Sequence, residues 1–332
     1  MKKKILDWLL APDEPAIRHL ALTELLEKPA PDPDVQATKA AMKEKGWIAS
    51  LFKEQLPEGY WYSYLSLYRP KYVATMWRAL VLADLGVTAQ ELGMKKACEL
   101  FLTNWAREDG GFGSRPAEAD SPKSYPSHFC ITGNLARTLI RCGYEDDPQV
   151  RSALDWIVKA QKEDGGWHCF PSKRGTLDCW EGLSAFAVFP RAKWTRRIKR
   201  SVERGAEFYL ERKLHREGGR RYEPWFRVHY PVHYYYDLLV GLDTLTALGY
   251  GDDRRIRLAL ELLRNKRRPD GSWALDAVHP DIAPDDPYQM KPPYVLQPPL
   301  AWALEWVNEP SKMITLRALR VLKRVDRNLP TN

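Results

Sequence analysis

Amphipathic and apolar stretches alternate along the chain. Val150, Leu154 and Ile157 recur at helical spacing, which predicts a helix with one buried face. The next stretch, residues 176–189, is apolar around most of its circumference and predicts a fully buried helix. The same alternation predicts inner helices at 14–28, 71–85, 127–142, 176–189, 232–248 and 311–325, and outer helices at 34–55, 92–107, 148–162, 196–213 and 253–267.

A short motif recurs at the ends of the predicted outer helices. Gln55 to Trp61 and Gln161 to Trp167 have the form Q-x3-G-x-W, and Arg267 to Trp273 differs only at the first position. Weaker copies lie at 106–112 and 214–220. The copies end at residues 61, 112, 167, 220 and 273, which are 51, 55, 53 and 53 residues apart. Such a period indicates a repeat architecture, in which each Gly ends an outer helix in the left-handed conformation.

The repeats span nearly the whole chain and predict a single domain, residues 1–332. Closing a ring of six inner and five outer helices requires one more outer helix, which residues 2–10 supply. We therefore predict an all-α (α/α)6 toroid. The Pro-rich stretch 274–310 predicts a lid over one mouth of the ring.

The Q-x3-G-x-W copies resemble the QW motifs of squalene-hopene cyclases and the related turns of protein prenyltransferase β subunits. The chain is thus similar to the terpenoid cyclase and prenyltransferase α/α-toroid superfamily, as a single-toroid member. The resemblance implies an enzyme that acts on an isoprenoid-like apolar substrate in a central cavity. The Asp-x-Asp-Asp acid of class II cyclases and the Asp-Asp-x-x-Asp magnesium motif are both missing.

Polar residues at the starts of the inner helices form the candidate site, because each turn leads to that end of an inner helix. A carboxylate half-buried among rings has a raised pKa and can protonate an alkene or act as a general base, while ring faces stabilise a carbocation. Alternatively, each carboxylate pairs with a base such as Arg174, Arg227 or Lys312. The candidate catalytic residues are Asp178, Glu181, His233, Tyr234 and Asp237, and the candidate substrate-binding residues are Tyr72, His128, Trp180, Trp225, His229 and Lys312.

The resemblance to prenyltransferases also implies a zinc site. In that family Asp and Cys at the start of one inner helix and His at the start of a later one hold the metal, and Asp178, Cys179 and His233 stand in comparable places. The family pattern is Asp-x-Cys, whereas here the two residues are adjacent and would point about 100° apart on a helix. Cys169 and His229 are therefore alternative ligands. The other interpretation is that these side chains only pack or bond to backbone.

Composition adds aromatic rings and a positive charge. The 13 Trp and 16 Tyr exceed what a plain helical bundle needs and predict a ring-lined cavity. The net charge is +8, but the basic clusters at 193–204, 212–221 and 264–268 lie where helix exteriors and C-termini are expected. Since no recognition motif accompanies them, no nucleic-acid partner is expected.

The remaining features concern location and the competing functions. No apolar run reaches the ~18 residues of a membrane span, no signal peptide begins the chain, and the five scattered Cys form no secreted disulfide framework. A cytoplasmic protein is expected, and no feature predicts its oligomeric state. The alternatives to an isoprenoid enzyme are a carbohydrate-active toroid that uses paired carboxylates and a non-catalytic lipid-binding toroid.

Overall fold

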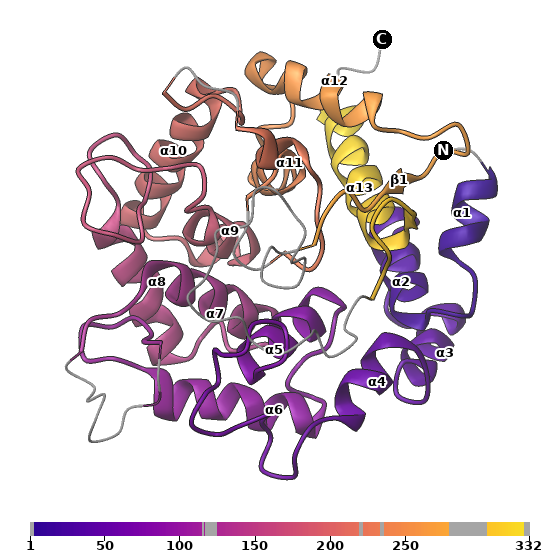
Figure 1. Ribbon diagram of the computed structural model, residues 1–332, viewed down its shortest axis with the longest axis horizontal. Coiled ribbons are helices and arrows are strands. Elements are labelled where there is room, and N and C mark those ends of the chain that lie inside the picture. Colours follow the sequence, from indigo (N-terminus) through magenta and orange to yellow (C-terminus); the bar gives the residue numbers. More distant parts are fainter. Residues whose placement is uncertain are drawn as a thin grey trace. The chain divides into compact units, whose positions relative to one another are not determined.

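The computed structural model describes residues 3–114, 116, 125–218, 222–232, 236–278 and 304–328. For residues 327 and 328 it describes the backbone alone. These residues form helices and one two-stranded sheet (Figure 1). They divide into two compact units, which are described in turn. The prediction of a single domain stays a prediction.

Unit 2 is a continuous stretch from Gln55 to Arg221 to which residues 233–236 are added. Helix α7 lies at its centre and packs against α5, α8 and α9, and α10 packs against α8 and α9 (Figure 1). Helices α5 and α7 are buried almost throughout, whereas α8 and α10 bury one face. The helices of this unit are α5 (Thr75–Asp84), α6 (Leu92–Leu100), η2 (Phe101–Trp105), α7 (Phe129–Arg141), α8 (Pro148–Ala160), α9 (Glu181–Val188), η3 (Arg191–Lys193) and α10 (Arg196–Glu211).

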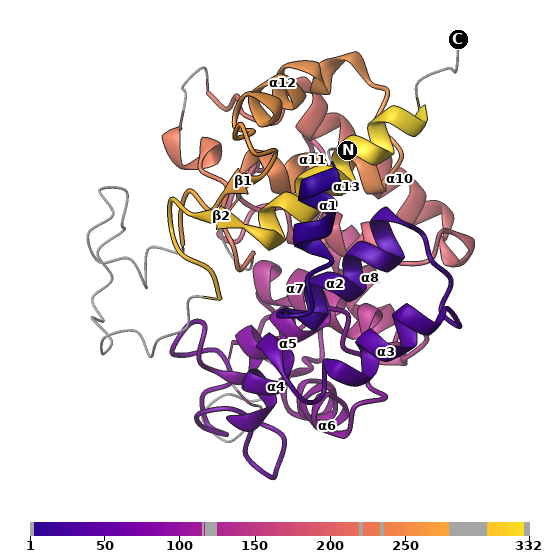
Figure 2. The ribbon, with the colours of Figure 1, turned by 90° about the vertical axis from the view of Figure 1, so that its right-hand side faces the viewer.

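Unit 1 is built from both ends of the chain, Met1–Glu54 and Asp237–Asn332, together with Tyr222–Val232. Its elements are α1 (Lys3–Leu9), α2 (Pro15–Leu20), η1 (Ala21–Leu25), α3 (Pro33–Ala41), α4 (Gly46–Lys53), η4 (Glu223–Phe226), α11 (Leu238–Ala247), η5 (Arg254–Ile256), α12 (Arg257–Asn265), β1 (Trp273–Ala274), β2 (Pro310–Ser311) and α13 (Lys312–Asn328). Helix α13 packs against α2, η1 and α11, so helices from the amino-terminal and carboxy-terminal parts of the chain lie side by side (Figure 2).

The segment predicted as a lid, residues 274–310, has its ends held together. Strands β1 and β2 pair antiparallel, with Trp273 opposite Ser311. Residues 279–303 lie outside the described part of the chain, so the covering role of this segment stays a prediction.

Every predicted helix is present, with three corrections to the boundaries. The outer helix over 34–55 is two helices, α3 and α4, separated by a turn at 42–45, and Gly46 begins α4 with a φ of +79°. The inner helix expected from 176 begins at Glu181, since Thr176 N donates to Trp167 O (2.9 Å) and stays extended. The helix expected from 232 begins at Leu238, where Asp237 caps it.

The repeated turns confirm the period found in the sequence. The Gly of each of the five copies has a positive φ, between +61° at Gly218 and +101° at Gly110. Only Gly takes this conformation at little cost. The glycines of the copies at 106–112 and 214–220, which lack the full motif, therefore keep the left-handed conformation. The five glycines are Gly59, Gly110, Gly165, Gly218 and Gly271.

The Gln of the motif ties each turn to the next outer helix. Gln161 Nε2 donates to Gly165 O (2.7 Å) in its own turn and to Ser201 O (2.8 Å) in α10. The copy at 106–112 has Ala at this position, and there Gln149 of α8 donates to Gly110 O (3.0 Å) instead. In this copy the glutamine that binds the turn therefore comes from the following outer helix.

The aromatic residue that closes each full motif is fully buried. The indoles of Trp167 and Trp273 donate to carbonyls of the preceding outer helix, at 2.9 and 2.7 Å. The backbone N–H of the closing residue donates to a threonine hydroxyl in the following inner helix at 2.9 Å, in the pairs Trp61 with Thr75, Phe112 with Thr132 and Trp273 with Thr315. These bonds fix where each inner helix begins.

Candidate functional site

Glu181, the first residue of α9, carries a carboxyl group that the surrounding protein leaves unused. The residue is 1% exposed, and its Oε2 has no hydrogen-bond partner within the described residues. Burial raises the pKa of Glu181 well above its usual value, and the charge of Cys169 adds to this, while Arg137 opposes it. Burial therefore favours the protonated form of this carboxyl group.

Two glycines fix the position of Glu181 at the crossing of α7 and α9. A Cβ added at Gly133 would lie 2.6 Å from the Cβ of Glu181, and one at Gly182 would lie 2.8 Å from the ring of Phe129. Contacts that short do not occur between real side chains, so the two backbones approach as closely as glycine allows. The Glu181 side chain cannot withdraw toward α7.

Aromatic and cationic groups lie beside this carboxyl group. Trp180 is 2% exposed, and the Arg137 guanidinium lies 4.8 Å from the centroid of its ring. The buried Tyr209 hydroxyl donates to Leu177 O (2.9 Å). Burial raises the pKa of Tyr209, to which the charges of Tyr236 and Glu181 contribute. Glu181 thus has two ring systems and one positive charge in its surroundings.

Three thiols adjoin the same helix start. The Sγ atoms of Cys179 and Cys169 are 3.5 Å apart, and Cys169 also interacts with the thiol of Cys130 on α7. Cys130 and Cys179 are buried, whereas Cys169 is half-buried. Hydrogen bonds from Cys130 and Cys179 lower the pKa of the Cys169 thiol, which favours its thiolate form.

The ligands predicted for zinc are only partly within the described structure. Asp178 is exposed and Cys179 is buried, and both precede α9 instead of lying on it, so the helical angle assumed between them is wrong. His233 and Tyr234 lie outside the described residues. Among the residues that are described, no group of three or more His, Cys, Asp or Glu side chains could hold a metal ion. The zinc site stays a prediction.

Asp237 and His229, which belong to unit 1, form a closed pair. Asp237 is fully buried and accepts hydrogen bonds from Val240 N (2.8 Å), His229 N (2.9 Å) and His229 Nδ1 (2.6 Å). Burial alone would raise the pKa of Asp237, but His229 and Arg317 hold it below its ordinary value. An ionised, capping carboxylate of this kind has no proton to donate, which favours a structural role.

The other predicted binding residues are mostly engaged or exposed. The Lys312 amine binds both oxygens of Asp13, at 2.8 and 2.9 Å, so this lysine pairs with none of the candidate carboxylates. Tyr72 is buried with its ring centroid 5.1 Å from that of Trp77. Trp225 is buried with an edge contact to Tyr222, and His128 is exposed before α7.

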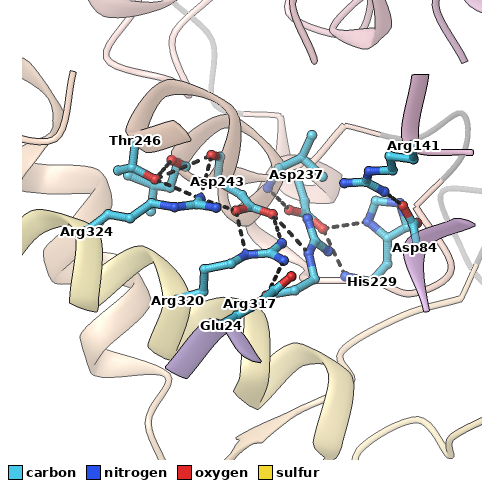
Figure 3. A network of polar contacts seen from close by, with 12 residues as sticks. Glu24, Asp84, Arg141, His229, Asp237, Asp243, Thr246, Arg317, Arg320 and Arg324 are labelled. Atoms are coloured by element: carbon cyan, nitrogen blue, oxygen red, sulfur yellow. Dashed lines mark hydrogen bonds and ion pairs between the residues drawn. The ribbon is translucent and has the colours of Figure 1, made fainter. Parts of the chain in front are cut away.

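Sequence reasoning missed Arg137, Cys130 and a network of charges in unit 1. In that network Asp243 of α11 binds Arg320 (2.5 Å), Arg324 (2.8 Å) and Arg317 (3.5 Å) of α13 (Figure 3). Arg320 also binds Glu24 of η1 at 2.8 Å. The sequence did contain a signal for these residues, because each of them is polar within a helix that is predicted to be buried.

Comparison with known proteins confirms the predicted resemblance and fold class. Residues 32–176 match the family model of the squalene-hopene cyclase C-terminal domain. A search of curated proteins found no match. The crystal structure of a protein from Actinoplanes is 18% identical over 98% of each chain, with a TM-score of 0.50. At this identity the similarity shows the fold alone, which is an all-α toroid.

Two structures of the type II terpene cyclase MstE from Scytonema are also similar. The apo form is 18% identical over 93% of this chain and 86% of that one, with a TM-score of 0.45. A variant in complex with geranylgeranyl dihydroxybenzoate is 17% identical over 96% and 88%, with a TM-score of 0.47.

The sequence contains no apolar run long enough to predict a membrane span. Within the described ranges, no helix is both long enough and apolar enough to cross a bilayer.

Proposed function

We propose that this protein is a terpenoid cyclase-like enzyme that acts on an isoprenoid-like apolar substrate, with Glu181 as its general acid. The observation that supports the proposal most is the buried carboxyl group whose Oε2 has no hydrogen-bond partner within the described residues and whose pKa is raised by burial. It offers a proton donor in a chain that lacks the Asp-x-Asp-Asp acid. Asp237, ionised and capping α11, offers none.

The proposed reaction begins with proton transfer from the Glu181 carboxyl group to one carbon of a substrate alkene. The π electrons form the new C–H bond, which leaves a carbocation at the other carbon and a carboxylate at Glu181. Attack by a second alkene of the same substrate closes a ring, and loss of a proton from a neighbouring carbon ends the reaction. The product is therefore an isomer of the substrate.

Neighbouring residues assist the charged stages of this reaction. Arg137 stabilises the carboxylate that Glu181 becomes, an interaction that grows as the proton leaves. The rings of Trp180 and Tyr209 favour a nearby cation through their quadrupoles. Burial of Glu181 keeps water from accepting the proton or trapping the cation.

The test is incubation of the protein with squalene, and separately with geranylgeranyl dihydroxybenzoate, followed by mass spectrometry. We expect a product of unchanged mass and altered retention time. Glu181→Gln should lower turnover by about 10²–10⁴-fold because the general acid is lost, and Glu181→Asp should retain part of it. Glu14→Gln, which alters a buried carboxyl group in unit 1, is the matched control and should keep turnover. Equal turnover by wild type and Glu181→Gln contradicts the proposed acid.

A non-catalytic lipid-binding protein is the second candidate. It is favoured by the pairing of Lys312 with Asp13 and of Asp237 with His229, which engages two of the predicted site positions in unit 1. Native mass spectrometry with the same two lipids separates the candidates. Stoichiometric binding without any isomer formed by the wild-type protein would support the binding function and remove the catalytic one.

A further inference from the structure

We propose that Cys169 and Cys179 form a hydroperoxide-sensitive dithiol, which closes to a disulfide immediately before helix α9. This site lies outside the acid chemistry proposed above and does not depend on it. The inference comes from the arrangement of three thiols around one half-buried sulfur.

The distance between two sulfur atoms identifies the cysteines that would form the disulfide. The Sγ atoms of Cys169 and Cys179 are 3.5 Å apart and share a hydrogen bond. Cys169 follows Trp167 by two residues and Cys179 follows Thr176 by three, and a bridge between Trp167 and Thr176 holds these two segments together. Forming a disulfide therefore needs a small approach of two atoms that already touch, instead of a rearrangement of distant segments.

Accessibility assigns the order of events. Cys169 is half-buried, so a small oxidant can reach it, whereas Cys179 and Cys130 are buried. The Cys179 thiol donates a hydrogen bond to the Cys169 sulfur, and the thiolate is the form of a cysteine that reacts with peroxides. Cys169 is thus the residue that the peroxide oxidises first, and Cys179 then reacts with the oxidised Cys169 to form the disulfide.

The chemistry balances with hydrogen peroxide as the oxidant. The Cys169 thiolate attacks one peroxide oxygen, the O–O bond breaks, and a sulfenic acid and hydroxide form. The sulfur of Cys179 then attacks the Cys169 sulfur, so an S–S bond forms and the S–O bond breaks. The hydroxide released takes up the thiol proton. In total, two thiols lose two electrons and two protons, and the peroxide is reduced to water.

The disulfide would tie the loop at 168–170 to the segment that enters α9. Cys179 stands two residues before Glu181, so the start of this helix would be held by a covalent bond in addition to its packing against α7. An effect on turnover rests on the proposed function, whereas formation of the disulfide does not.

The experiment treats the whole protein with a slight excess of hydrogen peroxide and then alkylates the remaining thiols. We expect intact-mass analysis to show the loss of two hydrogens, and peptide mapping to find a Cys169–Cys179 link that dithiothreitol removes. Cys98 and Cys142 are the internal control, because these thiols also adjoin but both are buried. They should remain reduced and be alkylated only after unfolding.

Variants separate the two roles. Cys179→Ser should leave a sulfenic acid at Cys169 that dimedone traps, and Cys169→Ser should abolish both the link and the trapped adduct. Cys98→Ser should behave as the wild type, and circular dichroism checks that each variant is folded. A link through Cys130, oxidation of Cys98 and Cys142 at the same rate, or no link at all would overturn the proposal. Because the readout is mass, failure here is distinct from failure of the Glu181 hypothesis, and Glu181→Gln should still form the disulfide.

Discussion

Two buried carboxyl groups with raised pKa values differ in how their oxygens are used. Burial raises the pKa of Glu14 to about 7, but its oxygens accept hydrogen bonds from Trp47 N (3.0 Å) and Ala16 N (3.3 Å) and cap α2. The Oε2 of Glu181 has no such partner in the described residues. Burying a polar group without a partner costs stability, and such costs are tolerated where a site performs chemistry.

The raised pKa of Glu181 makes stability depend on pH in a defined direction. Above the unfolded-state pKa of about 4.3, the unfolded chain releases this proton while the folded chain keeps it. The folded state then binds more protons, so the free energy of unfolding falls as pH rises toward the folded-state pKa. A neutral side chain at this position removes that dependence.

Glu181→Gln should therefore gain stability relative to wild type as the pH rises. The expected slope of the difference is up to about 1.4 kcal/mol per pH unit, and a gain above ~1 kcal/mol between pH 4.5 and 8 is expected. Urea unfolding of both proteins at several pH values measures it. Glu181→Asp, which keeps a carboxyl group, should follow the wild type. Parallel curves for wild type and Glu181→Gln would show that this carboxyl group is ionised when folded.

Among single residues, the sequence identified Glu181 and Trp180 but could not rank Glu181 above Asp237. Both begin apolar helices and both are buried. What distinguishes them is the partner: Asp237 binds His229, which lies eight positions earlier in the sequence, and helical or strand periodicity does not predict this contact. The thiol cluster was missed for a similar reason, since Cys130 and Cys169 belong to different repeats.

At the scale of elements, the repeated turns limit which side chains can replace glycine. Gly165 and Gly143 both have positive φ values, +88° and +94°. A Cβ at Gly165 would lie 2.5 Å from Arg204 O, whereas one at Gly143 has nothing within 4 Å. The first glycine is required for both backbone conformation and space, the second only for conformation.

Gly165→Ala should cost more stability than Gly143→Ala. Left-handed strain costs each variant about 1 kcal/mol, and the clash with the α10 backbone adds roughly 1–3 kcal/mol to the first alone. Thermal or urea unfolding of the two variants gives the difference. Equal losses would mean that α10 shifts without cost.

The crossing of α7 and α9 makes a related prediction. Gly133→Ala would place a Cβ 2.6 Å from the Glu181 Cβ and 2.7 Å from its carbonyl carbon. Separation of the helices should lower stability by about 1–3 kcal/mol and displace the Glu181 carboxyl group, so turnover should fall in protein that is still folded. Unchanged stability and turnover would show that the close approach has no role in positioning this residue.

The presence of the helices and turns was predicted more accurately than the residues at which the helices begin. The 51–55 residue period placed all five turn glycines, because a repeat constrains every copy. Helix starts depend on single hydrogen bonds, such as the Asp237 carboxylate that caps α11 (2.8 Å to Val240 N). A run of apolar residues continues through such a cap, so the pattern extends the predicted helix too far.

At the scale of the whole molecule, one unit gathers both ends of the chain around a buried charge. Asp243 is held by three arginines of α13, and Arg320 joins them to Glu24 of η1. The arginines at 317, 320 and 324 are spaced along one helix face. Burial would raise the pKa of Asp243, but these arginines hold it well below its ordinary value.

Asp243→Asn should destabilise unit 1 by about 3 kcal/mol at neutral pH, because it leaves buried arginines without their carboxylate. The unfolded carboxyl group titrates near 3.9, so this contribution is complete above that pH and is lost only as acid protonates the folded carboxylate. Hydrogen exchange should rise in α2, α11 and α13 and stay unchanged in α7 and α9. Uniform acceleration across both groups of helices would contradict a local role.

The partnership between Glu24 and Arg320 spans 296 positions of the chain, and this has a consequence for biosynthesis. At about 5–20 residues per second, a ribosome needs roughly 15–60 s to deliver α13 after η1 has emerged. Residues 55–221, by contrast, form one unbroken stretch that can fold during translation. The surfaces of α2 and η1 that pack against α13 lack this partner until α13 has been made, and we expect a chaperone to cover them during that time.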